Sequence, residues 1–250
     1  MQRAKSHRAA DILAHDGAAR QKLSGQVSVS GLIVFDFDNT LVHSQIDFAG
    51  CRRDLLALLR QAGHPDATDD QLTHLSIGQM IDAGAAHDRA FYDEGWRIVL
   101  EYETAGMVAS TVEQDATATL AALRDAGFKL SVMTNNARLA TLAALELFAM
   151  QSAFDLVLTR DEVAMKPDPA GILHAMSSLG AAGERTVMVG DSWMDGKAAM
   201  QAGVPFVGFR PRAGLLEERG VPAWAVVEQL SELLPLLAGP WPTASTRPVR

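Results

Sequence analysis

The sequence predicts an α/β fold, in which a doubly wound, mostly parallel sheet carries a small α-helical domain inserted after its first strand. Short apolar runs alternate with amphipathic helical segments along most of the chain, as in a sheet that helices cover on both faces. The apolar runs are continuous, which is typical of strands buried on both faces. The alternation is interrupted once, at residues 45–110, by a helical stretch too long for a simple crossover.

The predicted strands are the apolar runs at residues 32–36, 129–134, 155–159, 186–190, 205–208 and 224–227. The spacing of apolar residues between and after them predicts helices over residues 115–126, 137–148, 169–179, 195–202 and 228–238. Asp168 indicates an N-cap, with Pro169 at the first helical position. Gly180 and Gly203 follow helical runs, where a left-handed residue is favoured. Inside the insert, the pattern predicts helices over residues 49–63, 69–83 and 87–107.

These elements predict four parts of the chain. Residues 29–44 and 111–238 form the α/β core, and residues 45–110 form a helical cap. Residues 1–28 contain five basic and two acidic residues and no apolar segment, so we expect a flexible N-terminal extension and no secretory signal. Residues 239–250 are rich in Pro, Ser and Thr, and we expect a disordered tail.

Composition excludes several classes of function. The chain of 250 residues is 48% hydrophobic, enough for one large domain with an insert. Its net charge of −8 argues against a nucleic-acid-binding protein. The chain contains no unbroken run of 18 apolar residues, so we expect no membrane span. The single cysteine, Cys51, rules out an intrachain disulfide framework and fits a reducing compartment. We therefore expect a cytoplasmic protein. Whether it is a monomer or a homodimer stays open.

Polar side chains gather where predicted strands end. Asp36 and Asp38 come at the end of the first strand. Because residues i and i+2 of an extended chain point the same way, both carboxylates face one spot and Phe37 points away. Parallel sheets bind ligands outside the carboxyl ends of their strands, so we expect the later strand ends to contribute to the same site. Their polar residues are Thr134, Asn135, Lys166, Asp191 and Asp195.

Four aspartates, a lysine and a threonine together favour phosphate chemistry. Carboxylates this close repel one another, which raises their pKa values unless a cation joins them. Oxygen ligands with room for water suit Mg²⁺. A cation, a lysine and a hydroxyl then form a site for a dianion such as phosphate. A carboxylate nucleophile beside it would transfer the phosphoryl group through an aspartyl-phosphate.

Four stretches resemble the motifs of the haloacid dehalogenase-like hydrolase superfamily, in that family's order. They are DFDNTL (36–41), the strand end at Thr134, KPDP (166–169) and GDSWMDGKAAMQAG (190–203). The helical insert resembles the cap of the phosphoglycolate-phosphatase-like branch. The resemblance covers roughly residues 30–238. It implies a Rossmann-like core and a Mg²⁺-dependent phosphatase that acts on a small phosphorylated metabolite.

The resemblance also implies a role for the acids. Asp36 would be the nucleophile. Asp38 would be the general acid that protonates the leaving oxygen and later activates water, and its presence favours phosphate esters over dehalogenation or phosphonate cleavage. The carboxylates of Asp36 and Asp191 and the backbone carbonyl of Asp38 would hold Mg²⁺. Asp195 would orient the metal shell or the lysine.

The remaining motif residues would bind the phosphoryl group. Thr134 and the backbone N–H of Asn135 would contact its oxygens, and Lys166 would neutralise charge on the nucleophile and the phosphate. Two positions depart from the family. Asn39 stands where glycine is usual, and asparagine is the best substitute in a left-handed turn. His43 stands where an acid is usual, and it either touches the substrate or is an uninvolved surface histidine.

Several questions stay open at the level of sequence. A sugar phosphomutase could use the same aspartate pair, and a non-catalytic phosphate- or Mg²⁺-binding module could keep the site without turnover. The aromatic residues Phe91, Tyr92 and Trp96 are expected in the core of the cap. The cap arginines could grip a second anion of the substrate or simply pair with neighbouring acids. They are Arg52, Arg53, Arg89 and Arg97.

Overall fold

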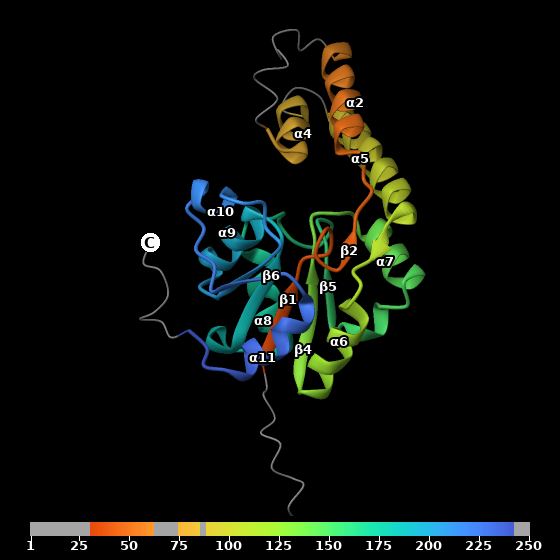
Figure 1. Ribbon diagram of the computed structural model, residues 1–250. Helices are drawn as coiled ribbons and strands as arrows, with labels where there is room; N and C mark the ends of the chain where they lie inside the picture. Colours follow the sequence, from red (N-terminus) through yellow and green to blue (C-terminus); the bar gives the residue numbers. More distant parts are fainter. Residues whose placement is uncertain (1–30, 63–74, 86–88, 243–250) are drawn as a thin grey trace, which may run out of the picture.

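The computed structural model describes residues 31–62, 75–85 and 89–242 of the chain (Figure 1). The expected extension at residues 1–28 lies outside the described residues, as do residues 69–74 of the predicted helix 69–83 and residues 243–250 of the predicted tail. Among the described residues, no helix combines the length and the apolar character that crossing a membrane would require.

A six-stranded sheet forms the centre of the molecule, in the order β5-β4-β1-β6-β7-β8. All five pairings are parallel, and β1 lies between β4 and β6. The α/β prediction is confirmed, and each predicted strand is present to within two residues at either end. The strands are β1 (Gly31–Phe35), β4 (Phe128–Met133), β5 (Leu156–Leu158), β6 (Thr186–Gly190), β7 (Phe206–Phe209) and β8 (Ala225–Val227).

Helices cover both faces of this sheet, as a doubly wound fold requires. Ile33 and Phe35 of β1 pack in one apolar cluster with α6 (Ala116–Asp125), α7 (Arg138–Leu147) and α11 (Leu233–Ala238). Leu32 and Val34 pack in the other with α8 (Ala170–Leu179), α9 (Trp193–Ala202) and the short α10 (Leu215–Glu218). Alternate residues of β1 thus point to opposite faces, and all four are fully buried, which explains its unbroken apolar run.

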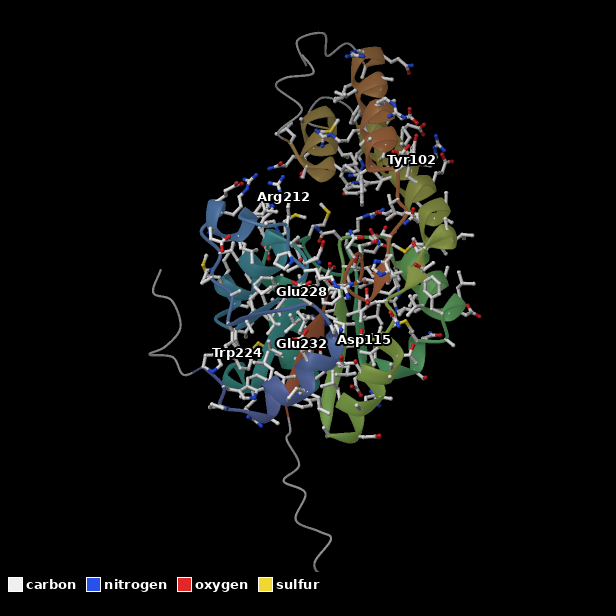
Figure 2. All side chains as sticks on the ribbon, in the orientation of Figure 1. Tyr102, Asp115, Arg212, Trp224, Glu228 and Glu232 are labelled. Carbon is white, nitrogen blue, oxygen red and sulfur yellow. The ribbon has the colours of Figure 1, made fainter. Side chains whose placement is uncertain are left out.

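The inserted segment forms a helical unit of α2 (Phe48–Gln61), α4 (Ile77–Ala85) and α5 (Arg89–Ala109). The three helices share an apolar cluster of their own, which includes Leu55, Ile81 and Phe91. Tyr102 of α5 donates a hydrogen bond of 2.8 Å to Asp54 of α2 at its edge (Figure 2). Figure 1 shows this unit over the carboxyl end of the sheet.

The two chain crossings between the helical unit and the sheet lie side by side. β2 (Val42–His43) pairs antiparallel with β3 (Thr111–Val112), a ribbon that the sequence did not predict because each strand has only two residues. Gly106 of α5 packs against Ile46 so closely that an added Cβ would lie 2.5 Å from the Ile46 Cα. The C-terminal end of α5 is therefore tightly joined to the chain that enters the unit.

Four details of the prediction are corrected. The helix predicted over 69–83 begins at Ile77 in its described part, and that predicted over 228–238 is divided into a 3₁₀ turn, Leu230–Glu232, and α11. Helix α8 begins at Ala170, so Pro169 precedes it, although the Asp168 carboxylate does accept a hydrogen bond from the Ala170 N–H at 2.8 Å. Helix α9 begins at Trp193, two residues before the predicted start.

The expected tail is wrong for residues 239–242. Trp241 stacks on Phe128 at a centroid distance of 6.5 Å and lies 5.5 Å from the Trp224 ring. Its indole Nε1 donates a hydrogen bond of 2.9 Å to the Leu237 carbonyl. The Pro-rich composition of this segment hid one aromatic residue that packs against the core.

Candidate active site

The ends of β1, β4 and β6 bring the predicted residues to one place. Asp36 directly follows β1, and its backbone N–H donates to the Val189 carbonyl of β6 at 2.8 Å. Phe37 is fully buried in the core cluster, so the two acids on either side of it face the carboxyl end of the sheet. Asn39 has φ of 55°, the left-handed conformation predicted for this turn. The chain therefore turns sharply just after Asp38.

Lys166 lies at the centre of the acids. Its Nζ donates to Asp36 Oδ1 and, at 2.6 Å, to Asp195 Oδ1, and the lysine and both acids are buried. The other oxygen of Asp195 accepts from the Ser192 N–H at 3.0 Å at the start of α9. Asp195 thus caps its own helix and orients the lysine, which joins the capping role and the supporting role that the sequence left as separate readings.

Burial and mutual repulsion shape the electrostatics of this cluster. Burial raises the pKa of Asp36 well above its usual range, and the charges of Asp195 and Asp191 raise it further against the opposing effect of Lys166. Burial also raises the pKa of Asp191, to about 6, with Asp195 again adding to the shift. Burial alone would lower the pKa of Lys166, but Asp195 and Asp36 raise it, so the lysine stays protonated.

The arrangement fits a divalent cation. Asp36, Asp191 and Asp195 each place one carboxylate oxygen within 4.8 Å of the others. Asp195 uses its two oxygens on Lys166 and Ser192, whereas Asp36 keeps one oxygen away from the lysine. Hard oxygen donors in this number, with space left for water, suit Mg²⁺. The part expected of the Asp38 backbone carbonyl stays a prediction.

Asp38 occupies a different environment from Asp36. Its Oδ2 accepts a hydrogen bond of 2.6 Å from Asn136 Nδ2 and a longer one, 3.4 Å, from the Thr134 hydroxyl. Its Oδ1 is shielded from solvent and makes no hydrogen bond with the described residues. Burial raises the pKa of Asp38, and the nearby Ser44 side chain, Lys166, Asn136 and Thr134 lower it in part.

The side chain of Asn135 is hydrogen-bonded to the protein backbone. Its Oδ1 accepts from the Lys166 N–H at 2.7 Å, and its Nδ2 donates to the Lys166 carbonyl at 3.1 Å. This pair of bonds holds the loop after β5 against the loop after β4, so the side chain of Asn135 positions the lysine. The sequence motif implied a role only for the backbone N–H of Asn135, and none for this side chain or that of Asn136.

A cleft of about 770 Å³ extends from these residues to the helical unit. The acids, Thr134, Asn135 and Lys166 line it on the core side. Its walls beyond them are largely apolar. They include Phe48, Ile77, Trp96 and Val99 from the helical unit and Met165, Trp193 and Met194 from the core. Trp96 therefore lines the cleft and also packs against the apolar cluster of the helical unit. The sequence predicted only its packing.

Two further charged residues tie the helical unit to the site. Glu103 of α5 forms a buried ion pair with Arg160, which also donates to the Asn135 carbonyl at 3.1 Å. The Arg160 guanidinium lies 4.5 Å from the centroid of the Trp96 ring. Neither Glu103 nor Arg160 lies in one of the four motifs. Because the two residues are far apart in the sequence, only the fold reveals that they form an ion pair.

None of the four cap arginines is among the residues that line the cleft. Arg97 pairs with Glu94 and Glu101, Arg89 with Asp93, and Arg53 with Asp47. Arg52 donates a hydrogen bond of 2.6 Å to the Leu75 carbonyl.

His43 also lies away from the cleft. Its Nε2 lies 2.7 Å from Oε2 of Glu113, the residue after β3. The reading of His43 and the cap arginines as surface and paired residues is the one that the geometry supports.

Residues 33–209 match the sequence profile of haloacid dehalogenase-like hydrolases. The chain belongs to this hydrolase family. It is 30% identical over 217 residues to the pyrophosphatase PpaX of Bacillus mycoides, covering 85% of this chain and 92% of that protein. It is 32% identical over 191 residues to a phosphoglycolate phosphatase of Agrobacterium fabrum, covering 72% and 80%. The structure of a haloacid dehalogenase-like hydrolase from Bacteroides fragilis superposes with a TM-score of 0.63 at 25% identity, covering 82% and 99%.

Proposed function

We propose that this hydrolase is a Mg²⁺-dependent phosphatase that cleaves a small phosphate monoester through an aspartyl-phosphate on Asp36. The observation that carries the proposal is the buried contact of Lys166 with Asp36 and Asp195, beside Asp191. The charge of Lys166 therefore supports a nucleophilic role for Asp36, with the carboxylates of Asp191 and Asp195 close by. Relatives named as phosphatases support the reaction class.

Asp36 performs the first step in this proposal. Its carboxylate attacks phosphorus, and the bond from phosphorus to the ester oxygen breaks in line with the attack. Asp36 must be ionised to do so, although burial and the nearby acids raise its pKa. Lys166 offsets that effect through its contact with Asp36. Mg²⁺ held by Asp36 and Asp191 would supply further positive charge against the carboxylates and the phosphoryl oxygens.

Asp38 moves the protons. It gives its proton to the departing ester oxygen, and it takes one from the water that then attacks the aspartyl-phosphate. Its raised pKa suits it to hold a proton before the first step, and its unpaired Oδ1 is available to carry that proton. Asn136 fixes the other oxygen, so only one end of the carboxylate is free. The products are the alcohol and inorganic phosphate, with Asp36 restored.

The phosphoryl oxygens are bound by the loop after β4. The side chain of Asn135 is occupied by Lys166, which leaves its backbone N–H for the phosphoryl group, together with the Thr134 hydroxyl. We also propose that the chain is divided into two parts. Residues 29–44 and 111–238 form the core, and residues 45–110 form the cap. The cap would close over the cleft and exclude bulk water while the phosphoryl group is transferred.

The test is phosphate release from an aryl phosphate, measured with Mg²⁺ and with a chelator. Asp36→Asn should abolish turnover, and Asp168→Asn, an exposed acid in the same loop as Lys166, should leave it unchanged. Chemical trapping should find the phosphoryl group on Asp36 of the wild-type protein. Unimpaired turnover by Asp36→Asn, or turnover unaffected by removal of divalent ions, would contradict the proposal.

No feature of the described residues favours the phosphomutase or the non-catalytic module over the phosphatase. A mutase would isomerise a hexose 1-phosphate without net release of phosphate. A non-catalytic module would bind beryllium fluoride at Asp36 and hydrolyse no phosphate ester. The same set of assays therefore separates the three possibilities.

A further inference from the structure

The cleft is larger than a phosphoryl group needs, and it has a second cationic residue. Among the described residues that line it, Lys166 and Arg219 are the basic ones. Lys166 is engaged by two carboxylates at the buried end. Arg219 lies on the core side of the cleft, just after α10, and its side chain is exposed.

The position of Arg219 is set by an aromatic ring rather than by an acid. Its guanidinium carbon lies 4.9 Å from the centroid of the Trp193 ring, and Trp193 also lines the cleft. Trp193 begins α9 two residues after Asp191, and both residues line the same cleft as Arg219. Among the described residues, no carboxylate forms an ion pair with Arg219, whereas Arg212 nearby lies 3.7 Å from Glu218.

We propose that Arg219 binds a second anionic group of the substrate, so that this enzyme selects small phosphate esters with a carboxylate or a second phosphoryl group. The inference rests on the proposed phosphatase function and adds the substrate class. A guanidinium presents planar donors that match an oxyanion in a bidentate manner. The cation–π contact with Trp193 holds the guanidinium without using its N–H donors.

The charges and walls of the cleft support this role. The carboxylates at its buried end repel a second anion, so a doubly anionic ester needs a cation at its far end. The middle of the cleft is lined by apolar side chains such as Trp96 and Met165, which offer no charge to bind. The four cap arginines that the sequence suggested for a second anion lie outside the lining, so this task falls to a residue of the core.

The experiment compares two esters that differ only in the second anion. Phosphoglycolate has a carboxylate where 2-hydroxyethyl phosphate has a neutral hydroxymethyl group. The ratio of kcat/KM for the first ester to that for the second should exceed one in the wild type. Arg219→Ala should lower this ratio about tenfold or more, mainly through KM for phosphoglycolate, as expected when a charge-assisted hydrogen bond is lost.

The matched control is Arg212→Ala, which removes the same charge from the segment before α10 (Figure 2). Arg212 does not line the cleft, so the ratio should stay at the wild-type value. Ethylene glycol bisphosphate compared with 2-hydroxyethyl phosphate repeats the test for a second phosphoryl group. The pair that responds to Arg219→Ala identifies which anion the site takes. If neither pair responds, the inference is wrong.

Asp82 of α4 also lines the cleft and is the alternative partner for Arg219. If the arginine serves the substrate, Asp82→Asn removes a repelling charge, and KM for phosphoglycolate should stay equal or fall. A rise in KM with Asp82→Asn matching that with Arg219→Ala would instead assign Arg219 to an ion pair that closes the cap, and would overturn the inference.

Failure of the inference is distinct from failure of the proposed function. Hydrolysis of an aryl phosphate with ratios unaffected by Arg219→Ala would reject the inference alone. If no ester is hydrolysed, calorimetry decides instead. The wild-type protein should then bind phosphoglycolate more tightly than 2-hydroxyethyl phosphate, and Arg219→Ala should remove that difference. Equal binding by the two proteins would reject the inference.

Discussion

Glu103 and Arg160 form an ion pair buried between the helical unit and the core, although they are 57 positions apart in the sequence. The second oxygen of Glu103 accepts a hydrogen bond of 3.1 Å from the Ala137 N–H, and Arg160 donates to the Asn135 carbonyl. Glu103 of helix α5 is therefore linked twice to the loop that is proposed to bind the phosphoryl group, directly at Ala137 and through Arg160 at Asn135. A displacement of α5 and a change in this loop are thus physically linked.

Arg160→Leu should destabilise the protein by about 3–5 kcal/mol at pH 8, because it leaves the Glu103 carboxylate buried without its partner. Burial already raises the pKa of Glu103, and loss of Arg160 would raise it further. The folded variant then binds a proton that the unfolded chain at neutral pH does not. Its stability, measured by urea unfolding, should therefore recover as the pH falls from 8 toward 5.5.

Two controls accompany this variant. The double variant Glu103→Leu, Arg160→Leu should be more stable at pH 8 than Arg160→Leu alone, because no unpaired charge remains. Arg97→Leu removes an exposed ion pair on the same helix and should leave the unfolding midpoint unchanged. A double variant no more stable than the single one would show that lost packing, and not the unpaired carboxylate, causes the effect.

Asn136→Ser should shift the pH profile of the reaction upward. Asn136 donates to Asp38 Oδ2 at 2.6 Å, and this bond lowers a pKa that burial raises. Without the bond, Asp38 keeps its proton to higher pH, so the alkaline limb of kcat/KM that depends on protonated Asp38 should move to higher pH. Stopped assays across pH 5–9 measure the shift. A profile that falls in height without moving would contradict this role.

Mg²⁺ binding should weaken at acid pH. The pKa of Asp191 is about 6 in the metal-free protein because of burial and the neighbouring Asp195. The cation requires the ionised carboxylate, so its affinity should fall by up to about tenfold per pH unit below pH 6. Calorimetry in buffers of different ionisation enthalpy should detect proton release near pH 6. Constant affinity from pH 5 to 8 would contradict the prediction.

Asn39 tests the turn that brings the acids together. Its φ of 55° is accessible to glycine and asparagine but strained for a β-branched residue. Asn39→Val should cost about 1–2 kcal/mol of unfolding free energy, and Asn39→Gly should change it by less than about 1 kcal/mol. Equal destabilisation by the two variants would show that the asparagine side chain, rather than the backbone conformation, is required.

The sheet and the motif residues were predictable because they depend on local patterns. Unbroken apolar runs such as that before Asp36 identify buried strands, and the topology of a parallel sheet brings their carboxyl ends together. The alternation of side chains along β1 predicted that Phe37 would point away from the two acids, and the structure buries it in the core cluster. Positions set by one strand and one turn are thus readable from sequence.

The residues that sequence analysis missed depend on contacts between distant segments. Nothing near Glu103 or Arg160 in the chain indicates that they would pair, and Arg219 resembles any surface arginine until the cleft is known. Ribbon β2–β3 has two residues in each strand, too few for a periodic signal. Charges and short strands that meet only through the tertiary fold leave no local pattern.

The contribution of Trp241 to stability can be tested with a truncated chain and a point variant. A chain ending at Pro242 keeps every described contact of Trp241 and should unfold at the wild-type urea concentration. Trp241→Ala removes the stacking on Phe128 and Trp224 and the hydrogen bond to Leu237, and should cost about 2–3 kcal/mol. Because these contacts lie on the core and away from the cleft, KM for an aryl phosphate should not change in either protein. Equal stability of Trp241→Ala and the wild type would show that residues 239–242 add nothing to the core, as their composition alone suggested.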